Sequence, residues 1–580
     1  MTEAIFTRTV IIGSGCAAWS AALHLNDLGD TDFLLLAEDI NAGTSRNTGS
    51  DKQTYYKLSL CGDEGDSVGQ MARDLMTGPD VDGDIALCEA AGSARGFYRL
   101  ANLGVPFPHN AYGEYAGYMT DHDRRARATS AGPLTSRYMT EALEKAAMTK
   151  GTRVLDRHMA VELLCGKNGI EGVLCLDLRE NQLKTIACSH VILCTGGPAH
   201  IYLDSVYPLS QHGMSGLALR AGATAANLHI WQYGLASTVF RWNVSGSYQQ
   251  ALPRYVSVDA KGIEREFLIQ AMKPAEALNL TFLKGYQWPF DERKIPGSSQ
   301  IDLLVKQETD HDRRVYLDYR RNPTGYDESA MNEETHTYLK NCGALQSTPL
   351  ERLKAINAPA IELYRNNGIH LESEMLEIKV CAQHHNGGIM VDDNWQSDVP
   401  GLYVAGEAAG TFGRVRPGGS ALNSTQVGSL RAAQHIAQKS ARPNPTKAPP
   451  SEKLFLPYGD AQGNPDVLAL SMQTAMSRVA GVSKNATGIK AHLVHVRRGL
   501  ENTRKMNADD PNLVSRILLK DLLETQKAVL ETMLYTLEHP ALGVLETRPK
   551  GCAYREPRPL PERNLWFESV WREYRGETDR

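Results

Sequence analysis

A short glycine-rich segment near the N-terminus has the residue types and spacing of a phosphate-binding turn. It reads Gly13-Ser14-Gly15-Cys16-Ala17-Ala18. Gly13 permits a tight turn, and Gly15 leaves room for the backbone to approach a pyrophosphate. Ala18 takes the third small position, where a helix packs against a strand. The spacing predicts that this segment binds a dinucleotide, with its pyrophosphate at the N-terminal amide groups of the helix.

Two strands and one helix must hold this turn in place. Thr9–Ile12 is an apolar, β-branched run that predicts a buried parallel strand, and Trp19–Leu28 predicts the helix. A second strand is predicted at Phe33–Ala37 and is followed by Glu38. Glu38 lies about 20 residues beyond the loop, where an acid bonds the ribose hydroxyls of a dinucleotide. This order favours a nucleotide site over a glycine turn without a ligand.

The composition indicates a soluble globular protein with several domains. The chain has 580 residues, of which 42% are apolar and 22% charged, and its net charge is −5. This balance excludes a basic nucleic-acid surface, and no window approaches ~18 uninterrupted apolar residues, so we expect no membrane span. The ten cysteines stand singly, without CxxC or zinc-type spacing. We therefore expect no metal site and a reducing, cytoplasmic environment. The N-terminal residues lack a cationic region, a long apolar region and a small-residue cleavage site, so we expect no secretory signal.

Three later segments carry glycines suited to lying near a flat cofactor. Residues 191–197 read VILCTGG, and residues 401–407 read GLYVAGE, a strand that ends in glycine and an acid. Residues 418–422 read GGSAL, which presents unobstructed backbone to a flat ring. A helix predicted from about Asn423 would direct its positive end at that ring. A glycine-rich turn that enters a helix explains the last segment but not the ordered series.

Together with HHNGGIMVDD at residues 384–393, these segments resemble the fumarate reductase and succinate dehydrogenase flavoprotein family, which also contains L-aspartate oxidase. The family signature includes HxxGGI, then PGLYAAGE, then an arginine before a glycine pair. The resemblance runs in order over nearly the whole chain. It implies an α/β fold: a doubly wound, Rossmann-like FAD-binding domain with an inserted α+β capping domain and a C-terminal helical domain. It also implies that FAD is the redox cofactor.

The resemblance implies which residues of this chain contact FAD. Relatives in membrane complexes carry a histidyl-flavin bond in the region that reads GTSRNTGSDKQ here, at residues 43–53. No histidine occurs between residues 26 and 108, so we predict that FAD is bound noncovalently. The predicted contacts are Gly13, Gly15, Ala17, Ala18, Glu38, Thr44, Ser45, Thr48, Gly49, Ala160, Thr195, Gly196, Glu407, Ser420, Ala421 and Leu422.

The family's chemistry is hydride exchange between the flavin N5 and a carbon of an acid substrate. His384 holds the histidine place of HxxGG, which implies that it binds a substrate carboxylate or carbonyl. The alternative is a histidine that packs in the core or against FAD. Arg416 matches the arginine before the glycine pair and suits a bidentate clamp on a carboxylate. Arg414 is either a second cation or a solvated side chain.

The capping half departs from the family pattern. Residues 232–237 read QYGLAS where the family often carries QxHPT, so that histidine is absent, and the family's RGEGG is missing as well. Arg241, Tyr248 and Arg254 are candidate proton donors from the replacement segment, with structural roles as the alternative. These departures disfavour a C4-dicarboxylate such as fumarate. They favour another unsaturated or oxidisable organic acid, bulkier or aromatic.

Three functions remain open from the sequence. The leading one is an FAD-dependent oxidoreductase that acts on a CH–CH bond of a small organic acid. The second is an oxidase or dehydrogenase of an amine or amino acid, similar to aspartate oxidase. The third is a flavoprotein subunit of an electron-transfer complex. Because only one dinucleotide fingerprint is present, a separate electron donor or acceptor is expected in each case.

The patterns also predict how the domains divide the chain. TDHDRR occurs twice, at residues 120–125 and 309–314, and charged turns are favoured over a metal or anion site. Short alternating strands at residues 152–190 predict a small β-meander. The predicted units are a first FAD-binding part at 1–235, a capping domain at 236–375, a second FAD-binding part at 376–440, a proline-rich linker at 441–464 and a helical domain at 465–580.

Overall fold

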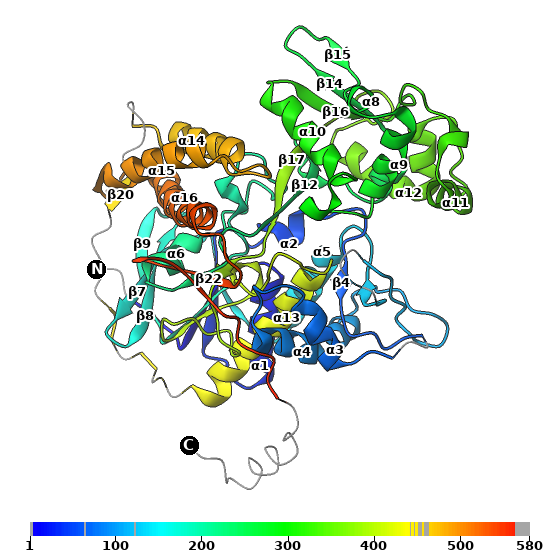
Figure 1. Ribbon diagram of the computed structural model, residues 1–580. Coiled ribbons are helices and arrows are strands. Elements are labelled where there is room, and N and C mark those ends of the chain that lie inside the picture. Colours follow the sequence, from blue (N-terminus) through cyan, green and yellow to red (C-terminus); the bar gives the residue numbers. More distant parts are fainter. Residues whose placement is uncertain are drawn as a thin grey trace.

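The computed structural model places the elements of the chain as Figure 1 shows. The residues that it describes run from 4 to 562, apart from 63–64, 121–122, 124, 441, 443, 446, 450–454, 458–462 and 508. More than half of the predicted linker therefore lies outside the described residues, as does the predicted helical domain from residue 563 onward.

A five-stranded parallel sheet lies at the centre of the nucleotide-binding half, in the order β19-β10-β2-β3-β6. The first two strands of the chain in this sheet have the predicted bounds. All residues of these two strands are buried, as a parallel sheet covered on both faces requires. The strands are β2 (Thr9–Ile12), β3 (Phe33–Ala37), β6 (Arg153–Asp156), β10 (His190–Leu193) and β19 (Leu402–Val404).

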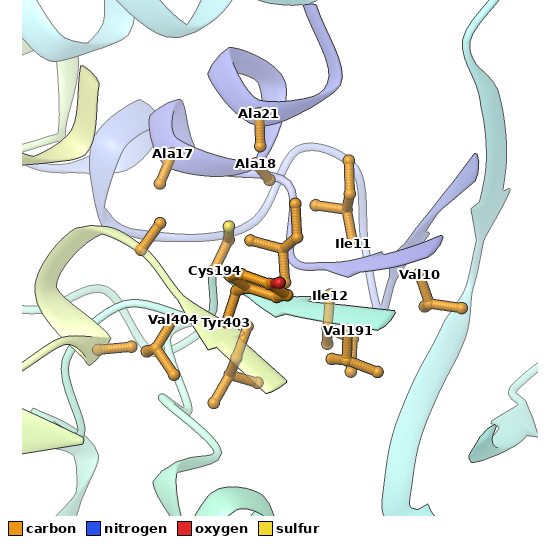
Figure 2. Close-up of a cluster of buried hydrophobic side chains, with 14 of the residues drawn as sticks. Val10, Ile11, Ile12, Ala17, Ala18, Ala21, Val191, Cys194, Tyr403 and Val404 are labelled. Carbon is orange, nitrogen blue, oxygen red and sulfur yellow. The ribbon is translucent and has the colours of Figure 1, made fainter. Parts of the chain in front are cut away.

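Helix α1 (Cys16–Asp27) packs on this sheet and contacts α5 (Thr135–Thr149) and α13 (Ser420–Gln434). Figure 2 shows Ala17, Ala18 and Ala21 on the side of α1 that faces the strand side chains. These small residues let the helix lie close to the sheet. The helix was predicted to begin at Trp19, but it begins at Cys16, because the chain enters it directly from the extended Gly15.

The predicted β-meander is confirmed. Strands β7, β8 and β9 pair antiparallel in sequence, and β1 adds to β9 in parallel. This small sheet contacts β3 and β10 and contributes to the same hydrophobic core. Its strands are β1 (Ile5–Phe6), β7 (His158–Gly166), β8 (Gly169–Asp177) and β9 (Gln182–Ala187).

The cap is built on a six-stranded antiparallel sheet in the order β13-β12-β17-β16-β14-β15, shown in green in Figure 1. Strand β12 runs across the predicted boundary at residue 235, so the sheet uses chain from both sides of it. The predicted domain bounds stay a proposal. The strands are β12 (Trp231–Ser237), β13 (Trp242–Asn243), β14 (Arg254–Val258), β15 (Glu264–Arg265), β16 (Arg314–Asp318) and β17 (Leu376–His385). The helices are α7 (Ser247–Gln250), α8 (Leu268–Ala271), α9 (Pro274–Lys284), α10 (Ser299–Asp310), α11 (Glu333–Asn341) and α12 (Pro349–Asn366).

Three long helices follow the predicted linker: α14 (Pro465–Val479), α15 (Ala486–Glu501) and α16 (Leu513–Glu538). They pack on one another, and α16 also contacts α6 (Ser215–Arg220) of the nucleotide-binding half. A C-terminal hairpin was not predicted: β22 (Val544–Arg548) and β23 (Gly551–Arg555) extend a sheet with β11 (Ala225–Ala226) and β18 (Gly388–Ile389). Among the described residues, no helix is both long and apolar enough to cross a membrane.

The remaining elements are short or peripheral to the site. The second TDHDRR copy forms the turn between α10 and β16, whereas Asp121, His122 and Arg124 of the first copy lie outside the described residues. The other named elements are α2 (Thr44–Asn47), α3 (Val68–Leu75), α4 (Gly83–Asn102), β4 (Tyr55–Tyr56), β5 (Ala128–Thr129), β20 (Phe455–Pro457) and β21 (Thr503–Lys505).

Candidate active site

A cavity of about 860 Å³ is lined by residues of both the nucleotide-binding half and the cap. Ligand sites typically enclose about 300–1,000 Å³, so this one suits a large ligand or two small ones. Most of the residues predicted to contact FAD line it. They are Gly13, Gly15, Ala17, Glu38, Thr44, Ser45, Thr48, Gly49, Ala160, Thr195, Gly196, Glu407, Ala421 and Leu422.

The predicted phosphate turn has the backbone that its glycines imply. Gly13 has φ +124°, and a Cβ placed there would lie 2.4 Å from the carbonyl oxygen of Cys194. Gly15 caps α1 and has no side chain to accept from the helix amides. The amide of Cys16 donates to the hydroxyl of Ser45 at 3.2 Å, and the next amides, of Ala17 and Ala18, are left for a ligand. Ala18 is fully buried and does not line the cavity, as expected of a residue that packs helix on strand.

Glu38 ends β3 at the position predicted for a ribose ligand. Its Oε2 lies 3.0 Å from Nδ1 of His212, which also lines the cavity. Burial disfavours protonation of His212, but the hydrogen bond to Glu38 and the charge of that carboxylate outweigh burial and raise its pKa. His212 therefore holds the carboxylate at the cavity edge.

Several polar atoms beside the cavity have no partner within the described chain. The hydroxyls of Thr44 and Thr195 are buried without a hydrogen bond. Both residues line the cavity, at α2 and just after β10. Since buried polar groups are normally paired, these two hydroxyls fit contacts to a bound cofactor.

Gly418 and Gly419, the glycine pair before α13, both line the cavity. Gly419 has φ +90°, and its Cβ would lie 2.6 Å from Cγ2 of Thr54. Because Gly419 adopts the left-handed conformation, α13 begins at Ser420, three residues before the predicted start at Asn423. Ser420 does not line the cavity; its hydroxyl donates to the carbonyl of Pro417 at 2.8 Å.

Arg416 is a buried cation that lines the cavity and has no carboxylate within 4.0 Å among the described residues. Its Nε and Nη2 donate to Oε1 of Gln232, at 3.2 and 2.5 Å, and its guanidinium lies 5.5 Å from the centre of the Phe412 ring. Burial lowers the pKa of Arg416 to about 10, although Glu407 opposes the shift. Its Nη1 donates to the hydroxyl of Ser420 at 3.4 Å, so both hydrogen-bond partners are neutral. A buried cation with neutral partners favours an anionic ligand.

His384 lies next to Gln232 because β12 and β17 pair these two residues directly. A β-bulge at Gln383 follows, and it brings the consecutive residues Gln383 and His384 both into the cavity wall. Asn386 donates from Nδ2 to the carbonyl of Gly413, so its Oδ1 accepts from Nδ1 of His384 at 2.9 Å. This network assigns the lone pair of the neutral ring to Nε2, which has no hydrogen-bond partner. Burial, aided by Arg416, lowers the pKa of His384 well below its usual value.

Glu407 lines the cavity close to His384, with 3.9 Å between its Oε1 and Nε2 of the histidine. The hydroxyl of Tyr207 and the backbone amide of His385 both donate to this carboxyl oxygen, the latter at 2.8 Å. Burial raises the pKa of Glu407 to about 7. The carboxyl group is therefore held in place by two hydrogen bonds, and no lysine or arginine of the described residues lies within 4.0 Å of it.

The candidate proton donors of the capping half do not line the cavity. Arg254 pairs with Glu264, Glu266 and Asp318, and Arg241 donates to the carbonyls of Tyr207 and Leu203. Tyr248 is buried, with its hydroxyl 3.4 Å from the carbonyl of Ala360. Arg414 is half exposed beside Asp80. His384 and Arg416 line the cavity and these four residues do not, so none of the four is placed to contact a ligand there.

Sequence reasoning missed several residues that complete the site: Tyr207, His212, Trp288 and Asn386, together with a role for Gln232. Apart from Asn386, each of them contacts a residue that is far away in the sequence. Asn386 alone had a local signal, since it stands two residues after His384. Among the described residues, no group of three or more His, Cys, Asp or Glu side chains is placed to hold a metal ion.

The open helix terminus, the ribose acid, the unpaired hydroxyls and the glycine pair fit FAD, and comparisons with known proteins agree. A family model described as an FAD binding domain matches residues 8–422. The chain is 24% identical to an L-aspartate oxidase of Streptomyces coelicolor over 84% of this chain and 78% of the relative. Its fold is similar to Sdh1 of Mycobacterium smegmatis (TM-score 0.72, 17% identity, 98% and 97% of the two chains). It is also similar to FrdA of E. coli quinol fumarate reductase (TM-score 0.68, 15% identity, 97% and 99%).

Proposed function

Because the chain belongs to the FAD-binding family whose model spans residues 8–422, it is an FAD-dependent oxidoreductase, and we propose that its substrate is a carboxylic acid oxidised or reduced at a CH–CH bond. The observation that carries this proposal is Arg416, buried in the cavity wall and hydrogen-bonded to the neutral side chains of Gln232 and Ser420. Its fork matches a carboxylate, and a bound acid would supply the missing negative charge.

Bound FAD supplies a hydride acceptor or donor at its N5 atom. Arg416 holds the carboxylate of the acid and thereby orients the adjacent carbons, and it stabilises the enolate-like charge that develops there. Gln232 keeps the guanidinium in one orientation through Oε1. His384 offers the lone pair of Nε2 to a substrate hydrogen-bond donor, or takes a proton there. Noncovalent attachment of FAD remains part of the proposal, since most of residues 43–53 line the cavity and none of them is a histidine.

The neutral cap side of the cavity supports a substrate with a single carboxylate. The residues between 236 and 375 that line it carry no charged side chain. Arg254 and Arg241 are engaged outside the cavity, and Lys52, which does line it, belongs to the nucleotide-binding half and not to the cap. A buried carboxylate without a cation is costly, so a C4-dicarboxylate is disfavoured.

Oxidation of an amino acid is the second candidate, and one observation favours it. The unpaired Nε2 of His384 is an acceptor, which suits the N–H of a substrate amine better than a carboxylate oxygen. Several relatives are L-aspartate oxidases, which gives this candidate further support. It shares the role of Arg416 with the first candidate and differs in the bond that is oxidised.

Anaerobic mixing of the purified chain with candidate substrates separates the two functions. We expect dithionite-reduced protein to be reoxidised by crotonate or cinnamate, or oxidised protein to be bleached by the saturated acids, with flavin absorbance as the measurement. Bleaching by amino acids alone would support the second candidate and refute the first. If neither class of compound changes the flavin absorbance, the isolated chain lacks both activities, as expected of a subunit that needs its partner.

A further inference from the structure

The indole of Trp288 fills the space next to Gly234, where a side chain at position 234 would lie. A Cβ on Gly234 would lie 2.4 Å from Nε1 of Trp288 and 2.9 Å from its Cε2. No side chain therefore fits at position 234 while the indole is present. The resemblance implies a histidine at position 234, the third position of QxHPT, but this chain has a glycine there. The cap therefore places an indole where the family pattern has an imidazole.

Two hydrogen bonds fix the backbone around the contact between Trp288 and Gly234. The amide of Phe290 donates to the carbonyl of Tyr233 at 2.7 Å, which ties the segment after the indole to β12. Nε2 of Gln383 donates to the carbonyl of Gly234 at 2.9 Å, from the opposite strand. Trp288 and its neighbour Tyr286 both line the cavity. The indole is thus a fixed part of the wall.

The carboxylate clamp and the indole lie on one face of β12. Gln232, which orients Arg416, and Gly234, against which Trp288 packs, are two residues apart on a strand whose pairing partner carries the bulge. Side chains two residues apart share a face, with a spacing of about 7 Å. A ligand anchored by its carboxylate at Arg416 would reach the indole with a group a few bonds away.

The polar side chains that the cap and its strands β12 and β17 contribute to the cavity wall are uncharged, the neutral His384 included. The cap contributes Asn243, Ser245 and Gln250 to the lining, and β12 and β17 contribute two further amides, Gln232 and Gln383. Amides and an indole offer hydrogen bonds and flat apolar surface, but they offer no counter-ion to a second carboxylate. The cap side of the cavity is therefore uncharged, whereas Arg416 provides a positive charge in the cavity wall.

We infer that Trp288 forms a distal subsite for a flat apolar group, so that the substrate is an aryl-substituted monocarboxylic acid with its carboxylate on Arg416. This inference rests on the proposed function and names the substrate class. Aromatic groups gain affinity from contact with an indole beyond the burial of their area. Trp288 is then a residue that determines specificity, and Gly234 is required to make room for it.

Binding to the oxidised holoprotein tests the subsite without turnover. The perturbation of the flavin spectrum gives dissociation constants for trans-cinnamate and 3-phenylpropanoate, for crotonate and butyrate, and for fumarate and succinate. We expect the aryl acids to bind the native chain most tightly. Trp288→Ala should weaken their binding about tenfold or more and leave crotonate within about twofold, whereas Trp288→Phe should retain most of the affinity.

Gly234→Ala provides an independent variant, because its methyl group displaces the indole. It should weaken cinnamate binding in the native background and have little further effect in the Trp288→Ala protein. The effects of the two substitutions on the binding free energy should therefore not add. Circular dichroism and flavin content check that each variant folds. Equal affinity of Trp288→Ala and native protein for cinnamate, or tighter binding of fumarate than of any aryl acid, would overturn the subsite. Cinnamate binding that Arg416→Gln leaves unchanged, or no spectral response to any acid, would instead overturn the proposed function and the subsite with it.

Discussion

Replacing Arg416 with glutamine is expected to lower kcat/KM for the acid substrate by about 100-fold or more and to leave the flavin content unchanged. The guanidinium is buried, and no described carboxylate lies within 4.0 Å of it, so its charge is available to the substrate. A hydrogen bond to a charged group contributes about 1.5–3 kcal/mol, and a bidentate clamp makes two of them. Steady-state kinetics together with the flavin absorbance of the purified variant measure both quantities.

Arg414 provides the matched control for this prediction. It is two residues away, and its half-exposed side chain does not line the cavity. Arg414→Gln should keep kcat/KM within about threefold, since surface substitutions generally have small effects. Arg416→Lys keeps the charge but loses the planar fork, and an intermediate loss is expected. If Arg416→Gln and Arg414→Gln behave alike, Arg416 does not hold the substrate.

Replacing Gly13 with alanine is expected to yield protein that is folded but largely free of FAD. The added Cβ would lie 2.4 Å from the carbonyl oxygen of Cys194, at a φ of +124° that side chains rarely adopt. The backbone must shift at the turn where the pyrophosphate binds, and strain of this kind costs about 1–3 kcal/mol before the clash is counted. The ratio of flavin to protein absorbance after purification, followed by titration with FAD, measures the loss.

Gly29 is the matched control for Gly13. It follows the same helix at the other end, with φ +80° and no atom within 4 Å of an added Cβ. Gly29→Ala therefore introduces similar backbone strain without a clash and away from the cavity. Its melting temperature should fall, though by less than that of the Gly13 variant because no clash is added, and its flavin content should stay native. Native flavin content in Gly13→Ala would mean that the turn does not carry the pyrophosphate.

The nucleotide turn was predictable because its signals are local. Gly13, Gly15 and Glu38 stand at fixed spacings between strands whose burial shows as continuous apolar runs. His384 and Arg416 were recognised for a related reason, since each lies within a short ordered motif. Local patterns of this kind determine both the chemistry and the backbone that presents it.

The cap side was not predictable, because its contacts join residues far apart in the sequence. Arg254 and Arg241 were candidates by charge alone, and only the folded chain reveals the carboxylates and carbonyls that engage them. Trp288 meets Gly234 across more than fifty residues, and nothing in either segment indicates the other. The missing histidine was visible in the sequence, but the side chain that takes its place was not.

The most direct test compares a carboxylic acid with its own amide. The oxidised holoprotein is titrated with trans-cinnamate and with cinnamamide, which have nearly the same shape and differ in charge, and the flavin spectrum reports binding. Because Arg416 lies in the cavity wall and no carboxylate of the described residues lies within 4.0 Å of it, the acid should bind about 100-fold more tightly than the amide, and Arg416→Gln should remove most of that difference. Equal binding of acid and amide by the native protein would contradict a carboxylate site at Arg416.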